Sequence, residues 1–587
     1  MTQQKKIVAK ECRFAIHIPT RSSDAPDLHL VKEVRHYEDG THEPFTNFVK
    51  NYKRPFAVTK EAYRNHEQKK ESESLDRLNT HHCTQSDLRL HVARALGKGW
   101  SNAQMRELSK SPFLYGTDVS STVHIKSEYR KRWPDVATDY TVAYYDIETD
   151  MTSEEGDPIM TTLVFEDLIH TTILSSFFRG YSNVVERILE MLEKQLKIEL
   201  PEKKYRLKIE LVESMVDLIK KPIDTAHERQ PDFIAIWNID FDLPKVIGAL
   251  ERQKVDIKDV FCHPRLPPHM RFCKYKKGKT KKVTASGQVK PMNPSEQWHS
   301  LLVPASFYFI CAMSSYRFIR QGAPEEPDYK LDSILEKEKI GGKLKMGVAD
   351  EFEGGDWHYA MQTRFKFEYV IYHIFDCIRM QQLNDKTGDL TTALPVRAGC
   401  SDFAKFNSQT KRLSDKYSIY LESRGHVIGV VEPKDDNKDV ASADEVLDVE
   451  DESDYSPNVE ASDADEPDPY EHLNEVLSLR NWIITLPSHQ TVLGLPLIKE
   501  YKGIRTQIRG LTYDSDAVSA YPSCTAAGNV SKATCSKEII TIDGVEENDF
   551  RRHNLNILQG HVNALEYGCE MFKLPKPREI LSYFEDM

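Results

Sequence analysis

The sequence lacks a long uninterrupted apolar run. The longest, "SLLVPASFYFICAM" from Ser300, is broken by Pro304 and is too short to span a membrane. The first residues, "MTQQKKIVAKEC", contain no apolar core of the kind that a signal peptide needs. We therefore expect an intracellular protein without a membrane segment.

Cysteines are few and show no paired spacing. Ten cysteines scattered through 587 residues are typical of reduced thiols rather than a disulfide framework. One local group has potential zinc ligands but fits no common zinc spacing: Cys262, His263, His269 and Cys273. No Walker-type glycine loop and no nucleophile elbow occurs, which argues against P-loop nucleotide hydrolases and serine hydrolases.

Basic residues are fewer than acidic ones, which gives a net charge of -12. The excess of acidic residues is concentrated in one segment. Residues 435–471 hold sixteen acidic residues and one lysine, a charge of -15 that leaves +3 for the rest of the chain. This stretch has few large apolar residues with which to offset chain entropy, so we interpret 434–472 as a disordered acidic insertion. It is either a solvated loop or a tail that screens DNA sites or recruits a basic partner.

The length predicts roughly three to five domains of mixed α/β class. Strand patterns in "DYTVAYYDIETD" from Asp139 and "PDFIAIWNIDFD" from Pro231 flank an amphipathic helix, "NVVERILEMLEKQL", that we expect Ser182 to cap. This order predicts an α/β domain over 140–389. Residues 1–139 form a separate mixed α+β module, which we expect to be continued by 390–505.

Acidic residues stand at strand ends and on one helix. Asp146 and Glu148 are two apart in a strand pattern and so point to the same side, where a divalent metal would relieve their repulsion. Oxygen ligands suit Mg²⁺ or Mn²⁺ rather than zinc. Asp242 follows the second strand, and Tyr372 and Asp376 are four apart on a predicted helix and share its face.

In order and spacing, "DIET", "NIDFD" and "YHIFD" resemble the three exonuclease motifs of family B DNA polymerases. "YKLDSILEKEKIGGKLKMG" from Tyr329 is similar to the segment before the third motif in phage-type members. The resemblance implies a ribonuclease-H-like proofreading domain that removes nucleotides from DNA 3' ends. It also implies that Tyr372 positions the attacking water and that two Mg²⁺ or Mn²⁺ ions are held by Asp146, Glu148, Asp242 and Asp376.

The second motif departs from the family pattern, because it has one residue fewer between Asn238 and "FD". The shortening leaves open whether Asp240 or Asp242 faces the metal. We favour Asp242, since it precedes the "LP" that begins the next helix in the family.

Near the end of the sequence, "DAVSAYPS" is similar to the first polymerase motif of the family. By that resemblance 506–587 starts a polymerase palm, Asp516 binds the polymerase metals, and the backbone near Ser519 holds the triphosphate of a deoxynucleotide. Tyr521 would then exclude a ribose. The second palm acid and the fingers lysine of the family do not follow Ser523, so we expect that this chain does not polymerise DNA alone.

We therefore expect the N-terminal part of a replicative, virus-encoded family B polymerase acting on primer-template DNA in an infected cell. A second polypeptide would supply fingers, thumb and the remaining palm, and a sliding clamp is a further candidate partner. Two alternatives stay open: a stand-alone 3'–5' exonuclease, or a non-catalytic DNA-binding or assembly subunit.

A basic run, "CKYKKGKTKKVTASG" from Cys273, resembles the place of a hairpin that moves the primer strand in the family. Its lysines would contact DNA phosphates without sequence preference, or else form a solvated loop: Lys276, Lys277, Lys279, Lys281 and Lys282.

Overall fold

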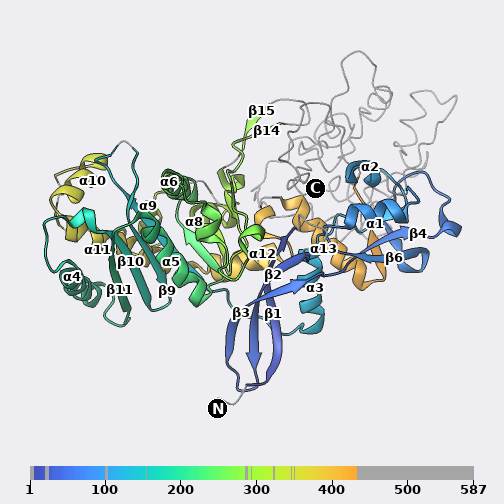
Figure 1. Cartoon of the computed structure of the whole chain (residues 1–587), viewed down its shortest axis with the longest axis horizontal. Helices are drawn as coiled ribbons and strands as arrows, with labels where there is room; N and C mark the ends of the chain where they lie inside the picture. Colours follow the sequence, from blue (N-terminus) through green and yellow to red (C-terminus); the bar gives the residue numbers. More distant parts are fainter. Residues whose placement is uncertain are drawn as a thin grey trace, which may run out of the picture. The chain divides into compact units, whose positions relative to one another are not determined.

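The computed structural model describes residues 5–19, 26–98, 103–153, 155–283, 289–292, 294–321, 324, 326–344, 347–348, 351–406 and 408–431. These residues form a mixed α/β structure with several sheets, so the predicted fold class is confirmed at that level (Figure 1). In the described part of the chain, no helix is both long and apolar enough to cross a membrane.

The N-terminal module is built on two small sheets. The first is an antiparallel sheet of order β1-β2-β3, made by β1 (Ile7–Ile18), β2 (Leu28–Tyr37) and β3 (His42–Lys50). The second has the order β6-β4-β7 and is made by β4 (Arg54–Thr59), β6 (Leu78–Cys83) and β7 (Leu114–Tyr115). Three helices accompany them: α1 (Leu88–Ala95), α2 (Met105–Ser109) and α3 (Ser121–Arg132).

The chain after residue 390 returns to this module. Strand β18 (His426–Ile428) pairs antiparallel with β5 (Ser72–Ser74), and α13 (Gln409–Ser423) packs beside β18 after the short helix α12 (Leu394–Ala398). Residues distant in sequence therefore complete one module.

The following domain is organised around a six-stranded sheet of order β11-β10-β9-β8-β12-β17. Its strands are β8 (Val142–Thr149), β9 (Pro158–Phe165), β10 (Leu168–Leu174), β11 (Arg206–Val212), β12 (Phe233–Ile236) and β17 (Tyr308–Cys311). The first three are antiparallel neighbours, whereas β12 pairs parallel with both β8 and β17. Its central strands are apolar because helices cover both faces.

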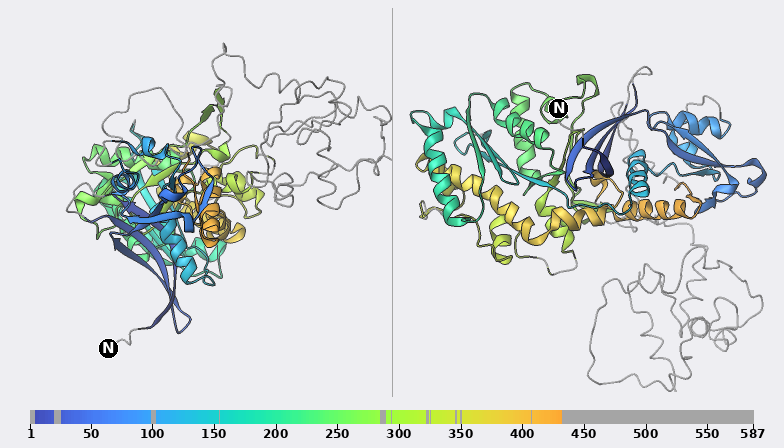
Figure 2. Two further views of the ribbon diagram at one scale, coloured as in Figure 1. Left: turned by 90° about the vertical axis from the view of Figure 1, so that its right-hand side faces the viewer. Right: turned by 90° about the horizontal axis from the view of Figure 1, so that it is seen from below.

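Two apolar clusters lie on the two faces of this sheet. Tyr144 belongs to the cluster that contains α4 (Val184–Glu199) and α11 (Lys366–Thr387), and Tyr145 belongs to the cluster of α5 (Met215–Arg229) and α6 (Ile239–Arg252). Strand side chains alternate between faces. The face of Tyr144 is therefore also the face of Asp146 and Glu148, and α11 packs along it (Figure 2).

Further described helices and strands lie in the chain between β12 and α11. They are α7 (Ile257–Phe261), β13 (Lys274–Lys276), β14 (Lys281–Val283), β15 (Val289–Pro291), β16 (Ser300–Leu302), α8 (Ala312–Ile319), α9 (Leu331–Lys337) and α10 (Gly354–Thr363). Strand β13 pairs with β16, and β14 with β15.

The predicted helix near residue 182 is α4, but its start differs from the prediction. It begins at Val184 after Asn183, whose φ of 51° is left-handed and whose side chain makes no capping bond, so Ser182 is not the cap. Burial of Val184, Ile188, Leu192 and Leu196, spaced four apart, fixes the helix by packing on the sheet instead.

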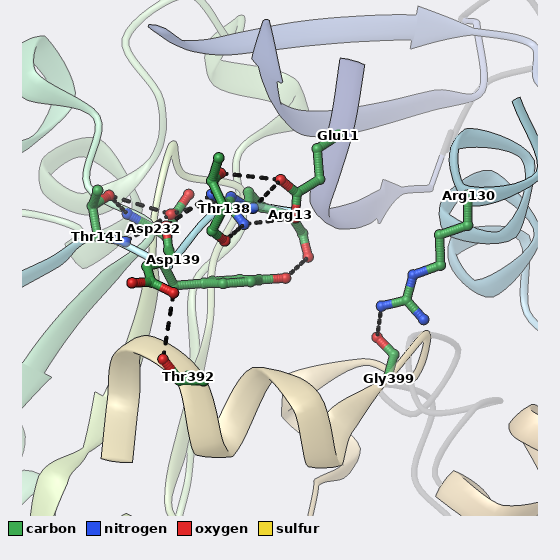
Figure 3. Close-up of polar contacts among 10 residues, drawn as sticks. Glu11, Arg13, Arg130, Thr138, Asp139, Thr141, Asp232, Thr392 and Gly399 are labelled. Atoms are coloured by element: carbon green, nitrogen blue, oxygen red, sulfur yellow. Dashed lines mark hydrogen bonds and ion pairs between the residues drawn. The ribbon is translucent and has the colours of Figure 1, made fainter. Parts of the chain in front are cut away.

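Arg13 joins the N-terminal module to the strand that leads into the sheet (Figure 3). Its guanidinium donates to the backbone oxygens of Thr138 at 2.8 Å and Asp139 at 3.0 Å, and lies 3.4 Å from the Asp232 carboxylate. The ring of Tyr140 lies 4.2 Å from the same guanidinium. Because this arginine is almost fully buried, the contacts fix the start of β8 relative to β1.

Candidate metal-binding active site

The site begins on β8, which places Asp146 and Glu148 two residues apart on one face of the sheet. Their side chains are 17% and 12% exposed, so both carboxylates are largely withdrawn from water. Two neighbouring carboxylates that are both largely buried repel each other, so a bound cation or a proton is needed to stabilise the pair.

Helix α11 faces these two acids with side chains spaced three and four apart. His373 Nδ1 lies 3.2 Å from Asp146 Oδ2 and 3.9 Å from Glu148 Oε1, and Tyr369 Oη donates to Glu148 Oε2 at 2.5 Å. Tyr372 and Asp376 follow on the same helix. Asp146, Glu148 and His373 form a group whose ligand atoms all lie within 4.8 Å of one another and which could hold a metal ion.

Asp242 reaches the same place from α6. The residue is 5% exposed, and burial raises the pKa of its carboxyl well above the usual value, with the charges of Asp146 and Glu148 adding to the shift. Asp242 lies in the first turn of α6, which begins at Ile239, so the expectation that the helix starts at "LP" is wrong. Pro244 lies inside this helix, past the turn whose N–H groups lack helical partners, and having no N–H it cannot donate the helical bond to Asp240 O.

Asp240 faces other residues. It accepts a hydrogen bond from Tyr275 Oη at 2.8 Å and lies 2.9 Å from Lys277 Nζ and 3.5 Å from His299 Nδ1. Burial raises the pKa of Asp240, but the hydrogen bonds from Lys277 and Tyr275 outweigh burial, so the pKa is lowered overall. Of the two acids that the sequence left open, Asp242 is therefore the one placed with Asp146 and Glu148.

Lys343 is part of the site although the sequence reading gave it no role. Its ammonium group lies 2.6 Å from Asp376 Oδ2 and donates to Tyr372 Oη at 2.9 Å. The lysine follows Gly342, whose φ of 72° and lack of a Cβ allow Asp332 to approach and accept from Lys343 N. This glycine turn directs the lysine toward α11.

The protonation of the acids follows from burial and from their neighbours. Burial raises the pKa of Glu148 to about 7, and the adjacent Asp146 adds to the shift. Burial also raises the pKa of Asp376, although Lys343 opposes it. Burial lowers the pKa of His373, but Asp146 and Glu148 outweigh it and raise the value overall.

These residues fit a divalent cation. Asp376 Oδ1 is buried without a hydrogen-bond partner among the described residues, and Asp242, with its raised pKa, is almost fully buried. Carboxylate oxygens are ligands for hard cations, and a cation would relieve the burial penalty. The imidazole of His373 adds a nitrogen to the set.

The predicted lysines lie in the segment around β13 and β14. Lys276 ends β13, Lys281 and Lys282 begin β14, and Lys279 lies between these strands. Lys277 pairs with Asp240. Gly278 is held closely, because an added Cβ would lie 2.9 Å from the backbone of Gln297 and Trp298.

Other predicted residues fall outside the described part of the chain or outside the site. Asp516, Ser519, Tyr521, the acidic insertion 434–472 and the palm segment 506–587 lie beyond the described residues. Cys262, His263, His269 and Cys273, the residues considered for zinc, do not form a metal-capable group in the described part of the chain. Among the described residues, that group is Asp146, Glu148 and His373. Cys262 instead donates its thiol to Phe272 O at 3.2 Å.

Sequence reasoning missed Tyr369, His373 and Lys343. Tyr369 and His373 stand three positions before and one after Tyr372 in the helix, so helical spacing alone contained a signal for Tyr369. Lys343 had no such signal, because a glycine turn brings it to α11 from a separate segment.

Compared with known proteins, the chain matches no protein-family model and no curated protein.

Proposed function

We propose that the chain is the N-terminal part of a family B DNA polymerase and that the site on β8, α6 and α11 is its 3'–5' exonuclease, on a ribonuclease-H-like domain. The observation that carries the proposal is the meeting of acids from three distant segments: Asp146 and Glu148, Asp242, and Asp376. Their strand and helix positions agree with the order of the three sequence motifs.

The described residues suit phosphodiester hydrolysis at a 3' end. Two Mg²⁺ or Mn²⁺ ions, held by the four carboxylates, would supply an activated water and stabilise charge on the leaving 3' oxygen. Tyr372 lies one turn from Asp376, where its hydroxyl can hold the attacking water. Lys343 holds that hydroxyl and places a positive charge beside Asp376.

The proposal includes a second polypeptide that supplies the fingers, the thumb and the other palm acid, with Asp516, Ser519 and Tyr521 in the shared nucleotide site. Proofreading then explains why an exonuclease and a polymerase motif occur in one chain. Primer-template DNA and deoxynucleotides are the substrates of this assembly.

Degradation of a 5'-labelled single-stranded oligodeoxynucleotide tests the exonuclease. The wild-type chain with Mg²⁺ should give a ladder of products shortened from the 3' end, and EDTA should stop it. The Asp146→Ala, Glu148→Ala double variant should give none, whereas Asp167→Ala, which changes an acid paired with Arg206 in the turn between β9 and β10, should cleave as the wild type does. A ladder that persists in the double variant would refute the assignment of the site.

A non-catalytic role predicts a different result. The folded wild-type chain would then bind DNA but leave it intact, both alone and together with the second polypeptide. Cleavage that appears only when the second polypeptide is present would support the exonuclease and the split assembly together.

A further inference from the structure

A cavity of about 250 Å³ lies where α3 and α13 meet the loop after α12. Figure 1 shows these helices on the side of the described chain that carries β4 and β6, away from α4 and α10. The residues that line it include three cations and no acid: Ser127, Arg130, Lys131, Cys400, Lys416 and Ile419. A cavity lined in this way attracts anions.

Gly399 brings two of the cations together. Arg130 Nη2 donates to Gly399 O at 3.0 Å (Figure 3). Gly399 has a φ of 61°, and a Cβ added to it would lie 3.2 Å from Lys416 Cε. The lysine stem therefore packs against the glycine that also accepts from the guanidinium. Positive groups from two helices are held near each other, although their mutual repulsion opposes this.

Two polar groups that line this cavity, the Lys416 ammonium and the Ser127 hydroxyl, have no partner among the described residues. Lys416 has no ion-pair partner among the described residues, while Lys131 lies 2.9 Å from Glu422. Ser127 is 3% exposed, and its buried hydroxyl has no hydrogen-bond partner in the described part of the chain. A phosphate group offers the charge and the acceptor oxygens that such donors need.

Beside the cavity, α13 exposes two tyrosine rings. Tyr417 and Tyr420 are 39% and 52% exposed, their ring centroids are 6.4 Å apart, and their planes differ by 18°. Arg424 lies 5.2 Å from the Tyr420 ring. Lys416 precedes Tyr417 directly and stands one turn before Tyr420. Exposed aromatic faces beside cations are the combination that binds single strands, through base stacking and phosphate contacts.

We propose that the surface formed by this cavity and by Tyr417 and Tyr420 binds single-stranded nucleic acid, with a backbone phosphate in the cavity and bases stacked on the rings. The ligand chemistry is a phosphate ester, and the neighbouring rings favour a polynucleotide over a free nucleotide. This surface is separate from the acids on β8 and α11, so the proposal does not depend on the exonuclease.

Fluorescence anisotropy of a labelled oligothymidylate with the full chain in EDTA tests the binding without cleavage. Lys416→Ala should weaken binding about five- to tenfold and lower the slope of log K against log salt by about 0.7, the value for one phosphate contact on a single strand. Tyr420→Ala should weaken binding about tenfold, since stacking on one ring is lost. Both positions are on the exposed side of α13, and circular dichroism will verify that the variants fold.

Matched variants separate the proposal from a general loss of charge or structure. Tyr420→Phe keeps the ring and Lys194→Ala removes an exposed lysine of α4, so both should bind as the wild type does. Unchanged affinity and salt slope in Lys416→Ala and Tyr420→Ala would overturn the proposal. Equal affinity for duplex DNA would overturn its single-strand preference.

Competition with a free nucleotide tests whether the cavity binds the phosphate of a mononucleotide or that of a polynucleotide. Thymidine triphosphate at the same phosphate concentration as the oligonucleotide should compete poorly. If it competes fully and Tyr420→Ala changes nothing, the cavity is a mononucleotide site and the polynucleotide assignment is wrong. None of these results depends on Asp146 or Glu148, so failure here is distinct from failure of the exonuclease.

Discussion

Lys343 Nζ lies 2.6 Å from Asp376 Oδ2 and donates to Tyr372 Oη at 2.9 Å, so one ammonium group joins two residues a turn apart on α11. Asp376 and Tyr372 were predicted from the sequence to act together, and this lysine connects them. Burial raises the pKa of Asp376, and the attraction of Lys343 limits that rise. Lys343 therefore opposes protonation of Asp376, the carboxylate that we propose as a metal ligand.

Replacing Lys343 with methionine should shift the pH dependence of cleavage. Without the ammonium group the pKa of Asp376 rises, so the acid limb of the rate profile moves to higher pH. On that limb the rate falls about tenfold for each unit by which the pKa rises. Single-turnover cleavage from pH 5.5 to 9 measures this. Lys343→Arg retains the charge and should leave the limb near its wild-type position, and a uniform loss at every pH would contradict the explanation.

The metal-free protein should become less stable as pH rises. Burial raises the folded-state pKa of Glu148 from 4.5 to about 7, so the folded state binds this proton more tightly than the unfolded chain does. The penalty for ionising it is absent below pH 4.5, grows between pH 4.5 and 7, and is complete above 7, at about 3 kcal/mol. His373, whose pKa is also raised, acts in the same direction.

Thermal unfolding at pH 5 and pH 8 in EDTA measures this effect. Glu148→Gln cannot ionise, and its stability should therefore change less with pH than that of the wild type. At pH 8, Mg²⁺ should raise the melting temperature of the wild type by relieving the same penalty, with about 1.4 kcal/mol expected at ten times the Kd. The Asp146→Ala, Glu148→Ala double variant should not respond, and an equal rise in it would place the metal elsewhere.

Asp242→Asn and Asp240→Asn should have different effects although the two acids are two residues apart. Asp242→Asn removes a buried carboxylate of the site and should lower kcat at least about a hundredfold, the scale of losing one charge-stabilising group. Asp240→Asn breaks the contacts with Lys277 and Tyr275 and should raise KM for DNA while kcat stays near its wild-type value. Steady-state cleavage of one oligonucleotide gives both constants. A larger loss of kcat in Asp240→Asn would reverse the assignment.

The sequence predicted the parts of this fold that depend on local periodicity. The alternation in "TVAYYDIET" gave β8 and the shared side of Asp146 and Glu148, and the apolar spacing after Ser182 gave α4. It did not give the start of α4, because a left-handed Asn183 begins the helix without a side-chain cap. It did not give the start of α6 either, since the helix begins at Ile239 and contains Pro244.

The candidate site was predictable where its residues shared an element, and not where long-range contacts made it. Tyr372 and Asp376 share a helix, so their spacing sufficed. Lys343 reaches them only through the tertiary approach of a glycine turn, and nothing local in "GGKLK" predicts its partners. The choice between Asp240 and Asp242 likewise depended on which helix face packs against β8.

Arg13→Met should destabilise the junction between β1 and the start of β8. It leaves the buried Asp232 carboxylate without its guanidinium partner, and breaking a buried pair on one side costs about 3–5 kcal/mol. Adding Asp232→Asn should recover part of this loss, because the amide carries no charge. Urea unfolding followed by circular dichroism measures both. Lys5→Met, which breaks an exposed pair with Asp39, is the control and should change stability by less than about 1 kcal/mol.

Asp516→Ala separates the two activities that the proposed function assigns to one chain. Asp516 would bind the polymerase metals, whereas the acids that we propose for the exonuclease are on β8, α6 and α11, so nucleotide release from a single strand should remain at the wild-type rate. Primer extension in the presence of the second polypeptide should be lost, because a two-metal site needs each of its bridging carboxylates. The double variant Asp146→Ala, Glu148→Ala should show the opposite pattern, extending primers and leaving mismatched ends uncut. If Asp516→Ala extends primers normally, "DAVSAYPS" is not the polymerase motif, and the stand-alone exonuclease becomes the better explanation of the acid cluster.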